Sequence, residues 1–248
     1  MDESRVVVIT GAGSGIGRAT AQAFFADGYR TVLVGRRTEK LQETAQQLTA
    51  SGTLDTDTVG RILVASADVT KPEAVAGVFE SVMQRWQRVD VLFNNAGINI
   101  PAATVDEIDF EDWSQVVAVN LNGMFLCTKY AVQCMKRQTP SGGRIINNGS
   151  ISAHTPRPGS AAYTATKHAV TGLTKATNLD CRECDIACGQ VDIGNAETQM
   201  VSKLKDLEVT IDVAHVAESI LNIANLPLNT NVPFMTIMAN RMPYMGRG

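Results

Sequence analysis

The sequence predicts a doubly wound α/β fold in which helices cover both faces of a mostly parallel, seven-stranded sheet. Short apolar runs rich in β-branched residues alternate with longer stretches of helical spacing. The short runs are continuously apolar, as in strands that are buried on both faces. Neither a repeat nor a linker divides the 248 residues, so we expect one domain over residues 1–248.

The alternation places each element in turn. Strands are expected at residues 5–10, 30–34, 61–65, 89–93, 144–147, 185–188 and 233–238. Helices are expected at residues 15–26, 39–49, 72–87, 112–137, 160–179 and 213–225. Pro72 suits the first turn of its helix, because the N–H group that proline lacks has no helical partner there.

Composition excludes several classes of protein. Hydrophobic residues make up 44% of the chain and charged residues 19%, which is typical of a globular protein and excludes a disordered one. The net charge of −3 leaves no basic excess for a phosphate backbone, so no nucleic-acid partner is expected. The sequence shows neither a signal peptide nor about 18 consecutive apolar residues. We therefore expect no membrane partner, a cytoplasmic location and five reduced cysteines.

A glycine-rich turn follows the first expected strand and reads Thr10-Gly11-Ala12-Gly13-Ser14-Gly15-Ile16-Gly17. Glycine lets the backbone approach a pyrophosphate, and the start of the next helix offers unpaired N–H groups. The turn predicts a dinucleotide site on a Rossmann-type domain, formed by Gly11, Ser14, Gly15, Ile16 and Gly17. Its spacing is T-G-x-x-x-G-x-G and differs from the general G-x-G-x-x-G pattern. The alternative is a glycine-rich turn without a ligand.

The end of the second strand bears on which dinucleotide binds. An acidic residue at this point binds the ribose 2′-hydroxyl of NAD. Here the strand ends in Gly35-Arg36-Arg37, and guanidinium groups attract a 2′-phosphate. NADP(H) is therefore favoured. NAD(H) stays possible, because Arg36 and Arg37 can instead begin a solvated helix.

Two later segments, together with the glycine turn, resemble the short-chain dehydrogenase/reductase family, and its ordinary-length oxidoreductases most closely. Asp68-Val69, after the third strand, resembles the acidic pair that contacts the adenine. Asn94-Asn95-Ala96-Gly97, after the fourth strand, resembles the motif that supports the sheet and lines the cofactor. The resemblance implies cofactor contacts from Asp68, Val69, Asn95, Ala96 and Gly97, at strand ends where ligands bind in such sheets.

The segment from Ser150 to Lys167 carries the chemistry. Tyr163 and Lys167 lie four residues apart on an expected helix, so their side chains share one face. A free phenol needs about 4 kcal/mol to ionise near neutral pH, and a neighbouring ammonium can supply part of this energy. With Ser150 at the end of the fifth strand, this set resembles the family's Ser and Tyr-x-x-x-Lys triad. Asn120 matches the asparagine that completes the family's tetrad.

The resemblance also implies the role of each residue. Tyr163 is the general acid in carbonyl reduction and the general base in alcohol oxidation. Lys167 stabilises the phenolate and binds the nicotinamide ribose, while Ser150 orients the carbonyl. Asn120 holds a water through which Lys167 exchanges protons. The cofactor carries the hydride, and the substrate is a small-molecule carbonyl compound or alcohol. For Tyr163 and Lys167 the alternative is an ordinary helix surface.

The stretch after the sixth expected strand departs from the family. The family has a Pro-Gly pair there, followed by a hydroxylated residue that binds the carboxamide. Taking Cys188-Gly189 as that pair puts Ile193 at the hydroxylated position. Val191 is then expected to bind the carboxamide through its backbone, and Thr198 is a candidate for the side chain. Residues 194–207 resemble the family's variable lid and identify no substrate.

Other features leave alternatives open. Cys181 and Cys184 lack a second ligand pair, so no metal site is assigned. His154 faces either the substrate or the solvent. The helix around Tyr163 carries many small residues, which suit packing within the chain or, as the resemblance implies, the interface of a homodimer or homotetramer. The rival function is a non-catalytic NAD(P)-sensing regulator on the same fold. Halohydrin dehalogenation is a third candidate, against which the complete glycine turn argues.

Overall fold

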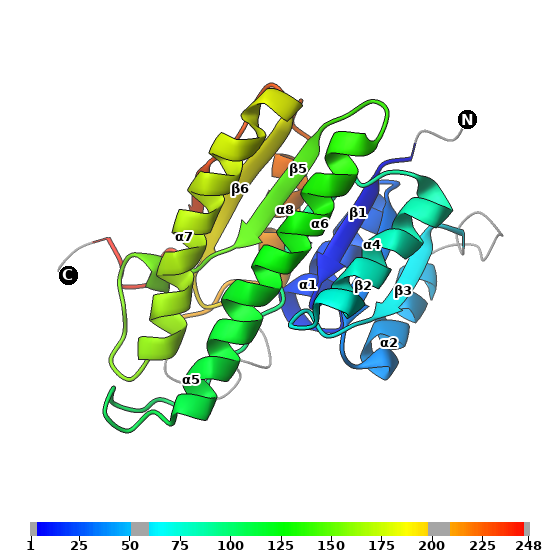
Figure 1. Cartoon of the computed structure of the whole chain (residues 1–248). Helices are drawn as coiled ribbons and strands as arrows, with labels where there is room; N and C mark the ends of the chain where they lie inside the picture. The colour runs from blue at the N-terminus through cyan, green and yellow to red at the C-terminus, as the bar shows by residue number, and fades with distance from the viewer. Residues whose placement is uncertain (1–3, 51–59, 198–208, 246–248) are drawn as a thin grey trace.

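The computed structural model describes residues 4–50, 60–197 and 209–245, which form a parallel sheet between two helical layers (Figure 1). The sheet of the described residues has seven strands in the order β3-β2-β1-β4-β5-β6-β7, and every neighbouring pair is parallel. The strands are β1 (Val6–Thr10), β2 (Arg30–Gly35), β3 (Ile62–Ser66), β4 (Val91–Asn94), β5 (Gly143–Asn148), β6 (Ile186–Ile193) and β7 (Phe234–Ile237). The predicted fold class is confirmed.

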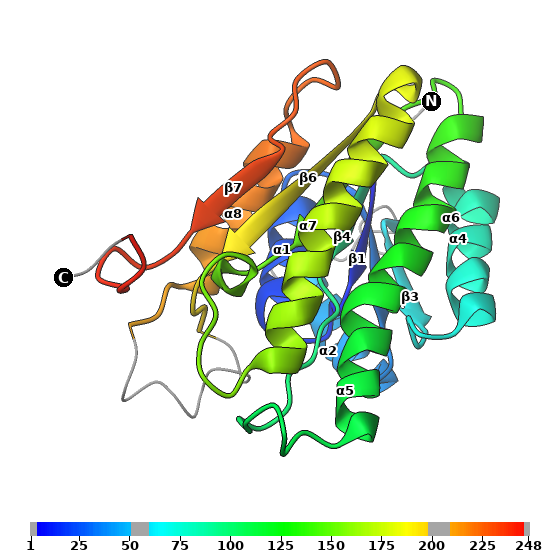
Figure 2. The same cartoon turned by 60° about the vertical axis from the view of Figure 1, so that its left-hand side comes forward.

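Helices cover both faces of the sheet. One face carries α4 (Pro72–Trp86), α5 (Phe110–Val117), α6 (Met124–Arg137) and α7 (Ala161–Cys181). In Figure 2, α4, α6 and α7 stand side by side, and α5 leads into α6. The other carries α1 (Gly15–Ala26), α2 (Thr38–Ala50) and α8 (Val213–Ala224). Along β1, Val6 and Val8 join the core under the first layer, whereas Val7 and Ile9 join the core under the second. Both faces of the strand are therefore apolar, which explains its continuous apolar run.

Two elements differ from their predicted form. The helix expected at residues 112–137 is helical from α5 to α6, but Ala118–Gly123 between them form a π-helical turn that contains Asn120. The sixth strand continues to Ile193, five residues beyond its predicted end, and every residue in it is buried. It carries Gln190 and Asp192. Because these side chains are polar, the apolar run ends at residue 188, and the predicted strand ended there as well. Both find hydrogen-bond partners inside the protein.

The strand order reverses beside β1, which lies between β2 and β4. In open α/β sheets, ligands bind at the carboxyl ends of the strands where the order reverses. The glycine turn after β1 and the Asn95–Gly97 segment after β4 meet at this edge. Within the part of the chain that the structure describes, no helix is long and apolar enough to cross a membrane.

Candidate active site

A cavity of about 390 Å³ opens at the carboxyl edge of the sheet. It runs from the glycine turn after β1 to Tyr163 on α7. The predicted site residues that line it are Gly11, Ser14, Gly15, Ile16, Arg36, Arg37, Asp68, Val69, Asn95, Ala96, Gly97, Ser150, Tyr163 and Lys167. Gly17, Asn120 and Val191 do not line it.

Gly11 and Gly17 in the glycine turn have no room for a side chain. Gly11 has a φ of +67°, and a Cβ atom there would lie 2.9 Å from Asn95 Nδ2. A Cβ atom on Gly17 would overlap the Gly11 carbonyl oxygen and lie 2.6 Å from the same amide nitrogen. Gly17 thus lies beneath the cavity and lets the first turn of α1 pack against the loop. The resulting bare backbone at a helix N-terminus fits the pyrophosphate of a dinucleotide.

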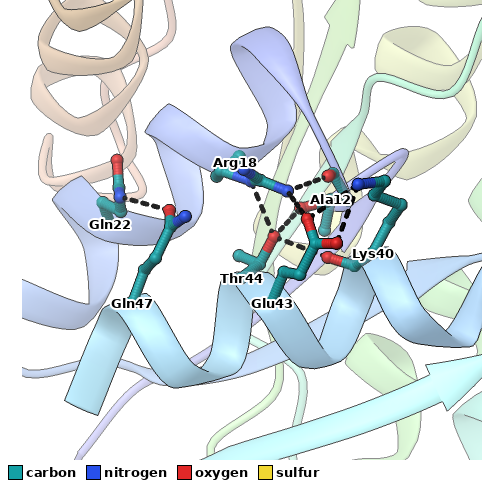
Figure 3. A network of polar contacts seen from close by, with 8 residues as sticks. Ala12, Arg18, Gln22, Lys40, Glu43, Thr44 and Gln47 are labelled. Carbon is teal, nitrogen blue, oxygen red and sulfur yellow. Dashed lines mark hydrogen bonds and ion pairs between the residues drawn. The ribbon is translucent and has the colours of Figure 1, made fainter. Parts of the chain in front are cut away.

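A polar network between α1 and α2 holds this turn from behind (Figure 3). Arg18 donates to the Gly13 carbonyl at 2.6 Å and to Thr44 Oγ1 at 3.0 Å. Thr44 in turn donates to the Ala12 carbonyl at 3.0 Å. Glu43 accepts from Lys40 Nζ at 2.7 Å and from Arg18 at 3.3 Å. The hydrogen bond from Lys40 is the main cause that holds the pKa of Glu43 below its usual value.

The end of the cavity beside β2 and α2 is rich in positive charge. Arg36, Arg37 and Lys40 line it, and the adjacent α2 begins at Thr38. Asp68 lies across from them, with its carboxylate accepting from Thr70 N at 3.0 Å and Thr70 Oγ1 at 2.9 Å. Burial raises the pKa of Asp68, but the two hydrogen bonds and the nearby Arg36 lower it by more. The net effect holds the pKa below its usual value, so the carboxylate is ionised at neutral pH.

The chemical end brings Ser150, Tyr163 and Lys167 together. The Lys167 side chain is buried, and its Nζ donates to the Asn148 carbonyl at 2.7 Å while lying 5.4 Å from the centre of the Tyr163 ring. Ser150 follows β5, and its Oγ accepts from Ser152 N at 3.1 Å. The Ser150 hydroxyl proton can therefore be donated to an oxygen in the cavity.

Comparison with known proteins agrees with this arrangement. Residues 5–208 match the family described as short chain dehydrogenase. The 3beta-hydroxysteroid dehydrogenase of Mediterraneibacter gnavus is 34% identical over 201 residues, which are 81% of this chain and 69% of that protein. Sulfoacetaldehyde reductase 2 of Chromohalobacter salexigens is 32% identical over 97% of this chain and 96% of its own length. The chain belongs to the short-chain dehydrogenase/reductase family.

Solved structures of similar fold contain either nicotinamide cofactor. A 3-ketoacyl-(acyl-carrier-protein) reductase from Brucella melitensis, complexed with NADH, has a TM-score of 0.87 and 25% identity, over 96% of this chain and 98% of its own. ElxO with NADP bound has a TM-score of 0.85 and 28% identity, over 94% of this chain and 97% of its own. This short-chain dehydrogenase/reductase is thus an NAD(P)-dependent oxidoreductase that acts on CH–OH groups.

The side chain of Asn120 is occupied by the loop that follows the N-N-A-G motif. Its Oδ1 accepts from Ile98 N at 2.8 Å, and its Nδ2 donates to the Ile98 carbonyl at 2.9 Å and to Thr166 Oγ1 at 3.3 Å. Thr166 in turn donates to the Tyr163 carbonyl at 2.8 Å. Asn120 thereby connects the loop after β4, at Ile98, to α7, which carries Tyr163. Both N–H groups of the Asn120 amide are thereby used, so a water held by Asn120 would bind to the second lone pair of Oδ1 or to the backbone within the π-helical turn.

The expectation that Val191 binds the carboxamide is wrong. Val191 lies inside β6, its side chain is buried in the core, and its carbonyl accepts from Gly149 N at 2.9 Å. Residues 193–196 line the cavity instead, because the strand ends at Ile193. The family's pair after this strand therefore falls on Ile193-Gly194 rather than on Cys188-Gly189. Thr198 and most of the lid-like segment lie outside the described residues.

Sequence reasoning missed Asp192, a carboxylate with no exposed surface directly behind Ser150. Its Oδ2 lies 2.8 Å from His154 Nε2. The His154 side chain is 42% exposed and does not line the cavity, so it faces the solvent while it also contacts Asp192. An acidic residue two positions after Gln190, among apolar residues, was the available signal. All five cysteines lie in the described part of the chain and carry free thiols. Among the described residues, no cluster of His, Cys, Asp and Glu has the arrangement of a metal site.

Proposed function

We propose that the chain is an NADP(H)-preferring oxidoreductase that interconverts a ketone or aldehyde and an alcohol, with Tyr163 as general acid and base. One observation carries the proposal. Tyr163, Lys167 and Ser150 line the same cavity that reaches Arg36 and Arg37 at its other end. A dinucleotide laid along this cavity has its phosphates at the glycine turn and its nicotinamide beside Tyr163.

The chain's own groups divide the proton chemistry. The Tyr163 hydroxyl gives its proton to the carbonyl oxygen during reduction and takes it back during oxidation. Lys167 keeps one N–H on the Asn148 carbonyl, which leaves two for ribose hydroxyls and holds positive charge near the phenol. Ser150 donates a hydrogen bond to the substrate oxygen. The cofactor supplies or accepts the hydride when bound.

The preference for NADP(H) rests on charge. Arg36, Arg37 and Lys40 line the adenosine end, and Asp68 is the only carboxylate among the described lining residues. Lys40 already pairs with Glu43, so the two arginines are the main candidates for a 2′-phosphate. Of the two solved neighbours described above, one contains NADH and the other NADP, so the fold accepts either cofactor and the proposed preference depends on these side chains.

The substrate is tested with a panel. The two relatives described above are named for a hydroxysteroid and for sulfoacetaldehyde, which differ in size and charge. We expect NADPH oxidation with at least one aliphatic, aryl or cyclic carbonyl compound, and slower turnover with NADH. A protein that binds cofactor but turns over no carbonyl compound with either cofactor would contradict the proposal and favour an NAD(P)-sensing regulator.

We also propose that the chain forms a homodimer or homotetramer. On α7, Leu179 is 63% exposed, and the small residues Ala165, Gly172 and Ala176 of the same helix are exposed as well. Phe125 on α6 is 50% exposed. Small residues let a second helix approach closely. Val116 and Val119, by contrast, are buried within the chain. Light scattering that shows only monomer would reject an oligomer. The cytoplasmic location stays a prediction.

A further inference from the structure

The carboxylate of Asp192 has three donors around it. Its Oδ1 accepts from Ser150 N at 2.9 Å and from Gln190 Nε2 at 2.6 Å. Its Oδ2 lies 2.8 Å from His154 Nε2. An ionised carboxylate can only accept hydrogen bonds, so the imidazole Nε2 carries the proton of this contact. Asp192 does not line the cavity, and none of the roles described above uses it.

We propose that Asp192 is a positioning residue for Ser150, and that His154 is the partner that holds the carboxylate in place. The role of Ser150 rests on the proposed function. Asp192 acts through the backbone of Ser150 and does not touch the substrate. Its hydrogen bond, together with that of Ser152 N to Ser150 Oγ, fixes the residue at two atoms. The hydroxyl oxygen is thereby directed while its proton stays available.

The residue before Ser150 is matched to this carboxylate. Gly149 lines the cavity, and a Cβ atom there would overlap Asp192 Oδ1 and lie 2.8 Å from Gln190 Nε2. Any other residue at position 149 would displace the carboxylate from Ser150. The contact between Asp192 and Ser150 therefore requires glycine at position 149, although 43 positions separate residues 149 and 192 in the sequence.

Gln190 connects the same carboxylate to the helix that carries Tyr163 and Lys167. Its Nε2 donates to Thr171 Oγ1 at 3.1 Å as well as to Asp192, and its Oε1 accepts from Thr174 Oγ1 at 3.3 Å. Thr171 and Thr174 both belong to α7. Hydrogen bonds through Asp192 and Gln190 therefore fix the position of Ser150 relative to α7. Because α7 carries Tyr163, they also help to set the distance between the serine hydroxyl and the Tyr163 phenol. Such supporting hydrogen bonds pre-organise a site.

A double-mutant cycle tests whether Asp192 acts through Ser150. With the carbonyl compound that the panel identifies, we expect Asp192→Ala to lower kcat about 10-fold to 100-fold, with NADPH affinity within about twofold of wild type. In the Ser150→Ala background the same change should have little further effect, because the group that it positions is gone. A merely structural role would instead add its loss to that of Ser150→Ala, and this additive outcome would overturn the proposal.

Asp192→Asn is the conservative rescue. Its amide oxygen still accepts from Ser150 N, so kcat should lie closer to wild type than to Asp192→Ala. The matched control is Asp90→Ala. Asp90 likewise accepts a backbone N–H, from Val6 at 2.7 Å, and pairs with Arg88, but it precedes β4 at the opposite edge of the sheet. His154→Gln should lower kcat less than Asp192→Ala does. Its control is His215→Gln, because His215 also lies beside a carboxylate, that of Glu218, but is exposed on α8.

Hydrogen exchange of the Ser150 amide gives a readout that needs no turnover. We expect the Ser150 N–H to exchange slowly in the wild type, faster in Asp192→Ala, and slowly again in Asp192→Asn and Asp90→Ala. An unchanged rate in Asp192→Ala would overturn the proposal. If Asp192→Ala does not fold, the exchange rate of the Ser150 amide is measured in His154→Gln and Asp192→Asn instead. A wild type without turnover contradicts the proposed function, whereas the exchange rates still decide whether Asp192 holds Ser150.

Discussion

Asn95 donates two hydrogen bonds to Thr10, between the ends of β4 and β1. Thr10 Oγ1 accepts from Asn95 N at 2.9 Å, and Asn95 Nδ2 donates to the Thr10 carbonyl at 2.9 Å. The same hydroxyl accepts from Ala96 N at 2.9 Å, and Asn95 Oδ1 accepts from Asn148 Nδ2 at 2.9 Å. The start of the glycine turn, the N-N-A-G segment and the end of β5 are therefore connected by one threonine and one asparagine.

Thr10→Val tests this connection. Valine keeps the shape of threonine but leaves two backbone N–H groups without their acceptor, so unfolding free energy should fall by about 1–3 kcal/mol. NADPH affinity should fall as well, because the turn that binds the phosphates loses its support. Urea unfolding and a fluorescence titration measure the two effects. Thr49→Val, at an exposed hydroxyl on α2, is the control, and equal effects from both variants would contradict the interpretation.

Tyr163→Phe tests the assignment of the general acid. Removing the phenol hydroxyl should lower kcat by about 10²-fold or more, because the phenol is the group proposed to give its proton to the carbonyl oxygen. NADPH affinity should stay within about twofold of wild type. Tyr130→Phe is the control, since Tyr130 lies outside the cavity and its ring, which the change keeps, stacks on Phe79 with centroids 6.3 Å apart. Full turnover by Tyr163→Phe would remove the mechanism.

Arg36→Ser and Arg37→Ser test the preference for NADP(H). If either guanidinium binds the 2′-phosphate, its loss should raise the KM for NADPH about tenfold, the equivalent of one charge-assisted hydrogen bond. The KM for NADH should change little, because NADH lacks that phosphate. Arg137→Ser, in the last turn of α6 and outside the cavity, serves as the control. A parallel rise for both cofactors would show that the arginines do not discriminate.

Two glycine substitutions in helices should have opposite effects. Gly17→Ala places a methyl group on the Gly11 carbonyl, so it should lower unfolding free energy by about 1–3 kcal/mol and weaken NADPH binding. Gly77→Ala lies on α4 with no atom within 4 Å of the new Cβ, so it should raise unfolding free energy by about 0.5–1 kcal/mol. Urea unfolding of both variants checks the signs, and a stable, cofactor-binding Gly17→Ala would contradict the packing argument.

Buried thiols should make the fold sensitive to alkali. Burial raises the pKa of Cys127 and of Cys188 to about 12, and that of Cys134 to about 11. An unfolded chain releases these protons near pH 8.5, so the folded state binds more protons above that pH. The stabilisation is complete below about pH 8.5 and is lost as pH rises towards 12. Unfolding free energy should therefore fall between about pH 9 and 11. Cys127→Ala should show a shallower fall, and an unchanged slope would contradict the assignment.

Local features of the sequence were enough for most of the fold and much of the site. Strands buried on both faces have continuous apolar runs, as in β1, and the glycine turn is defined by residues adjacent in the chain. Tyr163 and Lys167 share a helical face through their spacing alone. The structure brings these residues to one cavity, and their roles in binding and catalysis remain proposals.

Other features depend on partners far away in the sequence. The end of β6 was misplaced because Gln190 and Asp192 are buried only by virtue of hydrogen bonds to α7 and to the segment after β5. The Asn120 side chain is turned towards Ile98 and Thr166, which no helical pattern indicates.

The sequence by itself determined the strand–helix alternation, the phosphate-binding turn and the spacing of the Tyr–Lys pair, because each follows from residues that are neighbours in the chain. Only the tertiary structure decided where β6 ends, what Asn120 contacts and that Asp192 lies behind Ser150. The physical reason is that a polar side chain can be buried only where donors and acceptors satisfy it. Here those groups come from segments that meet only when the chain is folded.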